Sequence, residues 1–412
     1  MNSSTRDAYR ITDQLFLWLL IKPSDPILVG ELNLVRATRG VSLRYTDAWI
    51  ERGFALSEDL PLTDGEVLPT TRDTAAGAVD DARPDRWGER VIKFLDKPLR
   101  LSLLEYLYFA GDDRFGALGV STSNEHYSPR RTGPLPKLDE VSAVQALVRK
   151  VLAGEPIPDH EKRLIVPGVT MGGARPKALL DIDSEPWVVK FSDGDSIDTP
   201  LVEHASMTLA REAGIRAAET LAIRLVDGHA VAIKRFDREG QRRIHALSAN
   251  VALRAAADEL GYPELAQLLR RRGVVGGDVN RTQMRELFRR MVFNILLDNT
   301  DDHEKNHVLL VGDDQSYQLS PAFDVLPSGQ ALGYQQLRVG TEQADSTLVN
   351  AMSMCAAFGL TRDHAAREVR RVIGVIQRWI THFKSCGVSA RDLESLADQI
   401  DRPFLRDQRR DF

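Results

Sequence analysis

The segment NTDDHEKNHVLL, residues 299–310, gathers two aspartates, a glutamate, two histidines, a lysine and two asparagines between two apolar runs. Upstream, MRELFRRMVFNILL (284–297) repeats its apolar residues at the three- and four-residue spacing of a buried helix. Downstream, HVLLV (307–311) is typical of a short buried strand. A solvated turn, a metal site or an enzyme centre would each place polar side chains at such a junction.

The spacing within this segment favours an enzyme centre. Asp301 is followed five positions later by Asn306, which is the spacing of a protein-kinase catalytic loop. In that chemistry Asp301 accepts the proton of a substrate hydroxyl, and Asn306 presents its amide oxygen to Mg²⁺. The alternative is a polar helix C-terminus, where both residue types are common.

Asp324, in SPAFDVLPS (320–328), follows the hairpin that HVLLV and YQL (317–319) predict. Pairing of those two strands would return Asp324 to the neighbourhood of Asn306. Mg²⁺ prefers oxygen ligands and keeps several waters, so one asparagine and one aspartate beside ATP phosphates suffice. The alternative is an ordinary turn aspartate ahead of Pro327.

Lys190 stands inside the apolar strand pattern WVVKF, residues 187–191. Burying a lysine is unfavourable unless an anion compensates its charge. An ATP phosphate, or Glu203 of the following helix, is suited to that task. The alternative is an edge strand that turns Lys190 to solvent.

The stretch TMGGARPKA, residues 170–178, has the composition of a phosphate-side loop. Gly172 and Gly173 permit a close backbone approach to phosphates, and Lys177 adds positive charge. The stretch follows neither the P-loop pattern nor G-x-G-x-x-G, so a simple glycine turn remains the alternative.

Zinc binding is the competing interpretation of the opening segment. His303 and His307 are four positions apart and would share one face of a helix. The strand pattern of HVLLV breaks that geometry, and no cysteine or third histidine lies nearby in the sequence. Cys355 and Cys386 are typical of small buried residues rather than nucleophiles.

The composition of the whole chain is that of a globular protein. Its 412 residues suffice for two or three domains, with 43% hydrophobic and 27% charged residues. A net charge of −5 argues against a cationic nucleic-acid binder. Two cysteines, no signal-peptide pattern and an early apolar run (15–21) too short for a bilayer predict a cytoplasmic protein without a membrane partner.

Strand and helix patterns divide the chain into three predicted parts. These are an N-terminal subdomain at 1–130, a β-rich lobe at 137–238 and a helical lobe at 239–412. The elements predicted from periodicity and turn residues are strands at 15–21, 27–35, 40–45, 178–182 and 186–191, a hairpin turn at Asp227–Gly228, and helices at 138–153, 282–297 and 364–384, the last with Ile380 on its buried side. A β-rich part with glycine loop and strand lysine ahead of a helical part predicts a two-lobed, protein-kinase-like α+β fold.

In this order the motifs resemble those of the HipA-type serine/threonine kinases, the toxin half of HipBA type II toxin–antitoxin pairs. The resemblance extends over nearly the whole chain. The segments that resemble the small N-terminal subdomain of the family are ILVGELNLV (27–35), LPLTDGEVLP (60–69), DARPDRWGER (81–90) and DDRFGALGV (112–120). Those that resemble its glycine loop, ATP-lysine strand, hinge, catalytic loop and metal-aspartate segment are TMGGARPKALL, VVKF, VAIKRFDR, TDDHEKNHVLL and SPAFDVLPS.

The resemblance implies roles for individual residues. Asp301 is the catalytic base, Asn306 and Asp324 are Mg²⁺ ligands, and Lys190 contacts ATP phosphates and belongs to the catalytic set. The backbone of residues 234–236 holds the adenine. The implied ATP-binding set is Thr170, Gly172, Gly173, Ala174, Lys177, Lys190, Lys234, Arg235, Phe236, His303 and Asp324.

Three features depart from the family pattern. Thr170 stands where the family has a serine whose autophosphorylation ejects the glycine loop, so Thr170 is the autophosphorylation candidate here. Pro176 replaces a commonly acidic residue. Asp302 and Glu304 stand where small residues are frequent, and with His307 we interpret them as solvated loop residues.

Members of the family phosphorylate proteins of translation, notably an aminoacyl-tRNA synthetase, and arrest growth. They bind a small helix-turn-helix antitoxin and, through it, operator DNA. We therefore expect an ATP- and Mg²⁺-dependent kinase toxin with such partners. Two alternatives stay open: a small-molecule kinase on the same scaffold, and a weakly active pseudokinase that acts as a co-repressor.

Overall fold

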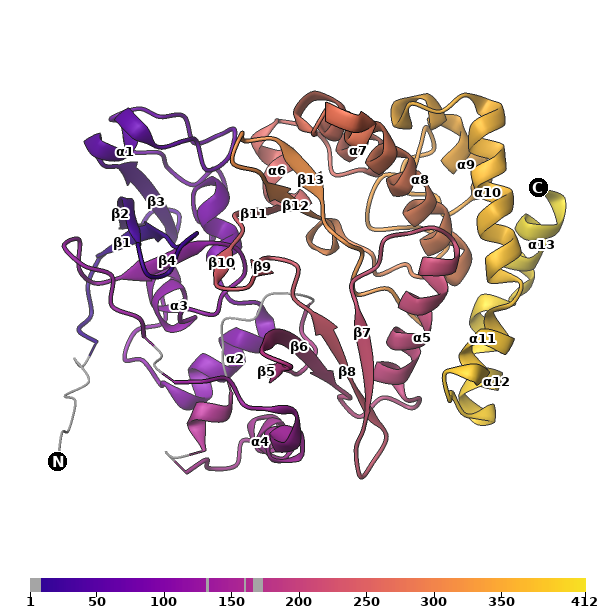
Figure 1. Ribbon diagram of the computed structural model, residues 1–412, viewed down its shortest axis with the longest axis horizontal. Helices are drawn as coiled ribbons and strands as arrows, with labels where there is room; N and C mark the ends of the chain where they lie inside the picture. The colour runs from indigo at the N-terminus through magenta and orange to yellow at the C-terminus, as the bar shows by residue number, and fades with distance from the viewer. Residues whose placement is uncertain (1–8, 131–132, 159–160, 166–172) are drawn as a thin grey trace.

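The computed structural model describes residues 9–130, 133–158, 161–165 and 173–412. Its N-terminal part is built on an antiparallel sheet of four strands in the order β3-β2-β1-β4. The strands are β1 Gln14–Leu19, β2 Ile27–Val35, β3 Gly40–Tyr45 and β4 Leu118–Ser121, and the helices are α1 Asp47–Arg52, α2 Arg86–Leu95 and α3 Leu103–Phe109. Figure 1 draws this part at the left.

A second antiparallel sheet, in the order β5-β6-β8-β7, follows in the chain. Its strands are β5 Lys177–Ile182, β6 Glu185–Phe191, β7 Thr220–Arg224 and β8 His229–Lys234, and its helices are α4 Val141–Ala153 and α5 Thr199–Glu212. Helix α5 begins at the cap Asp198, whose carboxylate accepts the Leu201 amide, with Pro200 in its first turn. The hairpin between β7 and β8 turns at Gly228, whose φ is +74°, as its Asp-Gly pair predicts.

The C-terminal part is mainly helical and carries a small antiparallel sheet in the order β11-β12-β13. Its strands are β11 Ala246–Ser248, β12 Val308–Val311 and β13 Tyr317–Leu319, after a short ribbon of β9 Arg238–Glu239 and β10 Arg242–Arg243. Its helices are α6 Ala249–Ala255, α7 Tyr262–Arg272, α8 Val279–Leu297, α9 Leu348–Ser353, α10 Arg362–Ile376, α11 Trp379–Ser385, α12 Ala390–Ile400 and α13 Pro403–Asp411. Helices α10 to α13 form the right-hand edge in Figure 1.

Helix α8 is the central, buried helix of this part, because residues on almost all of its faces are buried. Its buried Arg290 is compensated by Glu286 one turn earlier. Six 3-10 helices complete the described structure: η1 Gly77–Ala82, η2 Leu138–Glu140, η3 Lys162–Leu164, η4 Gly276–Asp278, η5 Glu304–Asn306 and η6 Cys355–Phe358. Within the described ranges, no helix combines the length and apolarity that a bilayer crossing requires.

Two buried clusters hold the three parts together. The larger cluster includes Leu17 of β1, Val231 of β8 and Leu296 of α8, so one apolar core runs through all three parts. The smaller cluster joins Trp87 of α2 to Val189 of β6. Burial of this apolar area is the main stabilising term, and it ties the N-terminal sheet to both lobes.

One predicted helix is wrong in its length. The pattern over 364–384 is two helices, because α10 ends at Ile376 and Arg378 leaves the helical backbone region with φ −101° and ψ 8°. This break lets the Trp379 ring enter the core and donate to Asp401 at 3.0 Å. Ile380 is consequently 46% exposed rather than buried.

Candidate active site

The loop at residues 298–307 is held at both of its ends. Helix α8 ends at Asp298, whose backbone is left-handed with φ 60° and whose amide donates to the Asn294 and Ile295 carbonyls. The Asp298 carboxylate accepts Arg402 at 2.7 Å, which ties the loop to the chain's C-terminal helices. At the other end, η5 leads directly into β12. The helix-to-strand junction predicted from the sequence is therefore confirmed.

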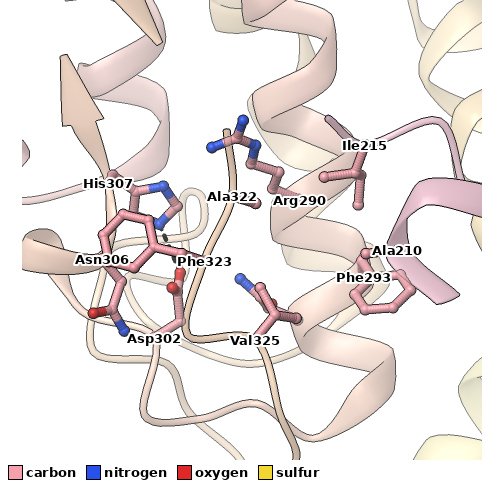
Figure 2. Close-up of a pocket in the computed structure, with 11 residues that line it drawn as sticks. Ala210, Ile215, Arg290, Phe293, Asp302, Asn306, His307, Ala322, Phe323 and Val325 are labelled. Carbon is pink, nitrogen blue, oxygen red and sulfur yellow. Dashed lines mark hydrogen bonds and ion pairs between the residues drawn. The ribbon is translucent and has the colours of Figure 1, made fainter. Parts of the chain in front are cut away.

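Asp302 and His307 are not solvated, which corrects their interpretation as loop residues exposed to water. Both are about 2% exposed, and His307 Nε2 lies 2.7 Å from Asp302 Oδ2. Tyr262 of α7 donates its hydroxyl to the same carboxylate and accepts Asn294 Nδ2 at 3.2 Å. Burial alone would raise the pKa of Asp302, but His307 and Tyr262 outweigh it and lower that pKa. Figure 2 shows Asp302 and His307 joined beside Asn306.

Asn306 presents a buried acceptor to which no described residue donates. The side chain is 4% exposed, and among the described residues its Oδ1 has no hydrogen-bond partner. A buried amide oxygen without a donor is costly unless another group satisfies it. A hard cation would do so, and the donor set suits Mg²⁺ because amide and carboxylate oxygens are its preferred ligands.

Lys190 lies at the centre of a buried ion cluster. Its Nζ is 2.6 Å from Glu203 Oε1 of α5 and 2.5 Å from Asp324 Oδ1. Strand β6 lies inside the sheet between β5 and β8, and the Lys190 side chain is 2% exposed, so the edge-strand alternative is wrong. Burial alone would lower the pKa of Lys190, but the two carboxylates raise it. Lys190 is therefore charged. It pairs with Glu203, the partner that the sequence suggested.

Asp324 reaches this cluster through an unusual backbone. Its φ is +59°, which is uncommon for a residue other than glycine. The preceding residues are fixed, because Ala322 exchanges backbone hydrogen bonds with Arg216 and Ala218 at 2.7 and 2.8 Å. The Phe323 ring packs on Phe236 with centroids 5.4 Å apart. Such strain concentrates at functional sites.

Asp301, in the loop at residues 298–307, is exposed to solvent. Burial of part of its surface raises the pKa of its carboxyl; His303 opposes that rise, and the negative charge of Asp324 adds to it. Asp301 and Asp324 are thus within electrostatic range although they are far apart in sequence. His303 Nδ1 is buried without a partner among the described residues, so its ring has an open polar atom.

The two histidines do not form a zinc site. They flank η5 rather than sharing one face of an α-helix, and His307 is already bonded to Asp302. No group of three or more His, Cys, Asp or Glu side chains with metal-binding geometry occurs in the described part of the chain. The helical geometry on which the zinc interpretation depended is therefore absent.

The glycine-loop residues are described only in part. Thr170 and Gly172 lie outside the described residues, whereas Gly173, Ala174 and Lys177 lie within them. Lys177 is fully buried, and its ammonium donates to the Asp85 carboxylate and to the Gly173 carbonyl at 2.7 Å. Its charge is thus held by a residue of the N-terminal part, which sequence patterns did not indicate.

The predicted hinge has two of its three amides engaged within the protein. Lys234 N donates to Glu219 O at 2.9 Å, and Arg235 N donates to Pro186 O at 3.2 Å. The Lys234 ammonium pairs with Glu185 at the surface, and the Arg235 guanidinium is buried. Phe236 has no partner for its amide within the described structure, and its ring offers an apolar face beside Phe323.

Comparison with known proteins identifies the family. A model of the HipA-like C-terminal domain matches residues 169–380, and a model of the HipA N-terminal domain matches residues 25–121. The chain belongs to the HipA family. The matched C-terminal region contains the glycine loop, Lys190, the catalytic-loop segment and Asp324.

Individual relatives extend this result. The HipA-family chain is 29% identical over 255 residues to "Putative kinase Y4dM" of Sinorhizobium fredii, an alignment that spans only 56% of each protein. HipA of Shewanella oneidensis, solved with HipB and its operator DNA, is 17% identical over 97% of both chains with a TM-score of 0.67. That likeness shows a shared two-lobed, kinase-like α+β fold. The kinase CtkA of Helicobacter pylori matches 56% of this chain and 90% of its own at 14% identity, with a TM-score of 0.37.

Proposed function

We propose that this HipA-family protein is an ATP- and Mg²⁺-dependent serine/threonine kinase that acts as the toxin of a toxin–antitoxin pair. The observation that carries the proposal is the buried Lys190–Glu203–Asp324 cluster, beside a catalytic loop whose Asn306 Oδ1 lacks a partner among the described residues. Phosphoryl transfer depends mainly on positioning and charge neutralisation, and these residues supply both.

Each residue then has a defined task. Asp301 accepts the proton of the substrate hydroxyl, which requires its ionised form. Asn306 and Asp324 hold Mg²⁺ through oxygen atoms, and Lys190 holds an ATP phosphate while Glu203 and Asp324 balance its charge. Bound Mg²⁺ neutralises negative charge on the phosphates.

The remaining ATP contacts are proposed for the hinge, the glycine loop and His303. The Phe236 amide and ring border the adenine. The open Nδ1 atom of His303 suits a polar group of the nucleotide. Thr170 stays the autophosphorylation candidate. The proposed partners are a HipB-like antitoxin, through it operator DNA, and a translation protein such as an aminoacyl-tRNA synthetase; the name of the Shewanella complex supports the first two.

The test compares wild type with Asp301→Asn in labelled ATP and cell lysate. We expect wild type to label a protein and the variant to lose about 10²- to 10⁴-fold in rate, because the proton acceptor is gone. ATP affinity measured by calorimetry should change little. Asp313→Asn is the matched control, since Asp313 is 77% exposed on the β12–β13 turn.

Each alternative has its own signature in this experiment. Label confined to small molecules supports a small-molecule kinase. Absence of ATP binding with Mg²⁺ supports a pseudokinase that acts as a co-repressor. Full protein labelling by the Asp301→Asn variant would refute the role of Asp301.

A further inference from the structure

Lys177 and Lys190 stand directly opposite each other on neighbouring strands. They are register partners in the antiparallel pair β5–β6, and both side chains are buried. Like charges in this position repel, and burial makes the repulsion stronger because water does not screen it. Each lysine therefore needs its own anion. Lys190 has Glu203 and Asp324, and Lys177 pairs with a further carboxylate.

Asp85, in the N-terminal part, is an anion that balances Lys177. Its Oδ2 accepts the Lys177 ammonium, and its Oδ1 accepts the Gly88 amide at 2.8 Å as the N-cap of α2. Two interactions, the ion pair with Lys177 and the N-cap bond from Gly88, therefore fix the position of this carboxylate. The bond from Gly88 to Oδ1 sets the orientation of the carboxylate, and the Lys177 ammonium binds the other oxygen, Oδ2.

Trp87, two residues after Asp85, binds the backbone of the same lysine. The indole Nε1 donates to the Lys177 carbonyl at 2.8 Å, and the Trp87 side chain is buried. The first turn of α2 thus holds Lys177 both at its ammonium and at its carbonyl. In Figure 1, α2 lies next to β5, although the two segments are far apart in the sequence.

The same lysine also reaches the described end of the glycine loop. Its Nζ donates to the Gly173 carbonyl at 2.7 Å. Asp85 in addition lines a cavity of about 60 Å³ that Lys305 of the catalytic loop and Phe323 share. The N-terminal segment is therefore in contact with the glycine-loop side of the site and borders its catalytic-loop side.

We propose that Asp85 and Trp87 of the N-terminal subdomain are positioning residues for ATP binding. They hold Lys177, and through it Gly173, in the arrangement that receives the phosphates, and Asp85 prevents Lys177 from repelling Lys190. This inference rests on the proposed kinase function. It makes the N-terminal subdomain a part of the nucleotide site rather than a separate docking module.

Asp85→Asn in the full chain is the direct test. Asparagine has nearly the same shape and still caps a helix, but it lacks the charge that Lys177 requires. Since hydrogen bonds between charged groups are the strong ones, we expect ATP affinity measured by calorimetry to weaken about 10- to 100-fold. The KM for ATP should rise more than kcat falls.

Two further variants separate positioning from general damage. Trp87→Phe keeps the buried ring but removes the indole N–H, and we expect a smaller loss of ATP affinity in the same direction. Glu89→Gln is the matched control in α2, because among the described residues its carboxylate pairs only with Lys93, at the surface and at 3.8 Å. Its ATP affinity should equal that of wild type.

The outcomes distinguish this inference from the proposed function. Wild type that binds no ATP overturns the proposed function, and this inference falls with it. Wild type that binds ATP, together with a folded Asp85→Asn variant of unchanged ATP affinity, overturns the inference alone, whatever happens to turnover. Should Asp85→Asn fail to fold, Trp87→Phe with unchanged ATP affinity overturns it instead.

Discussion

Asp81 is a half-buried residue of the N-terminal part whose carboxylate contacts the C-terminal part. Its two oxygens accept the Ser248 amide and hydroxyl, each at 2.7 Å. Burial raises the pKa of Asp81 to about 6, more than the bonds from Ser248 lower it. A carboxyl with a raised folded pKa binds a proton more readily in the folded state. Its contribution to stability is therefore largest below the unfolded pKa and declines as pH rises to about 6.

Asp81→Asn tests this assignment, because an amide does not titrate and can still meet Ser248. We expect the decline in unfolding free energy between pH of about 4 and about 6 to become shallower than in wild type. Urea unfolding at several pH values measures it. Asp64→Asn, at an exposed position, controls for the loss of one negative charge. A steeper decline in the Asp81 variant would contradict the assignment.

At the scale of elements, one buried hydrogen-bond network joins α7, α8 and the loop at residues 298–307, the proposed catalytic loop. Tyr262 at the start of α7 donates to Asp302, and Asn294 of α8 donates to Tyr262. Asn299 Nδ2 extends the network to Asn294 Oδ1 at 3.1 Å. The catalytic loop is thus fixed by helices on two sides, which limits the positions open to Asp301 and Asn306.

Tyr262→Phe removes the donor of this network without creating a large cavity. Since Asp302 then loses a hydrogen bond in a buried place, we expect an unfolding free energy lower by about 1–3 kcal/mol in urea titrations. Tyr334→Phe is the control, because the Tyr334 side chain is 50% exposed, and its effect should stay within about 0.5 kcal/mol. Equal stability of the two variants would argue against the network.

At the scale of the whole molecule, Asp237 joins the N-terminal part to the segment after β8, the predicted hinge. Its carboxylate accepts Arg235 at 2.7 Å, Arg238 at 2.8 Å and the Gly116 amide at 2.8 Å. Arg235 in turn donates to the Asp113 and Arg114 carbonyls. Burial alone would raise the pKa of Asp237, but the two guanidinium groups outweigh it and lower that pKa.

Asp237→Asn leaves two buried cations without their anion. We expect it to lower the unfolding free energy by about 3–5 kcal/mol near neutral pH. Because the folded pKa is lowered, this contribution is present above the ordinary carboxyl range and is lost as pH falls below it, so the difference between variant and wild type should shrink in acid. Urea titrations at neutral and acidic pH measure both effects.

The control for this variant is Asp227→Asn. The pair of Asp227 with Arg149 lies at the surface, where the two side chains are 72% and 58% exposed. Exposed ion pairs contribute about 1 kcal/mol or less. A loss in Asp237→Asn no larger than that of the control would mean that the hinge is not held by this cluster.

Much of the fold follows from local sequence patterns. The period of apolar residues located the strands near residues 15, 27 and 40, the hairpin at Gly228 and helix α8, because a buried face must repeat with the geometry of its element. The break at Arg378 was missed, since the apolar period continues across it in the sequence. A backbone deviation that lets Trp379 meet Asp401 leaves no mark on that period.

For the candidate site, the sequence by itself indicated that Lys190 needs an anion and offered Glu203 as a candidate, which the structure pairs with it. A lysine inside an apolar strand pattern indicates, from the local sequence alone, that an anion must compensate its charge. The roles of Asp301 and Asn306 stay predictions. Only the tertiary structure decided that Asp302 and His307 are buried and that Asp85 holds Lys177 from 92 residues away. The physical reason is that burial and ion pairing depend on what packs nearby, and those neighbours come from distant parts of the chain.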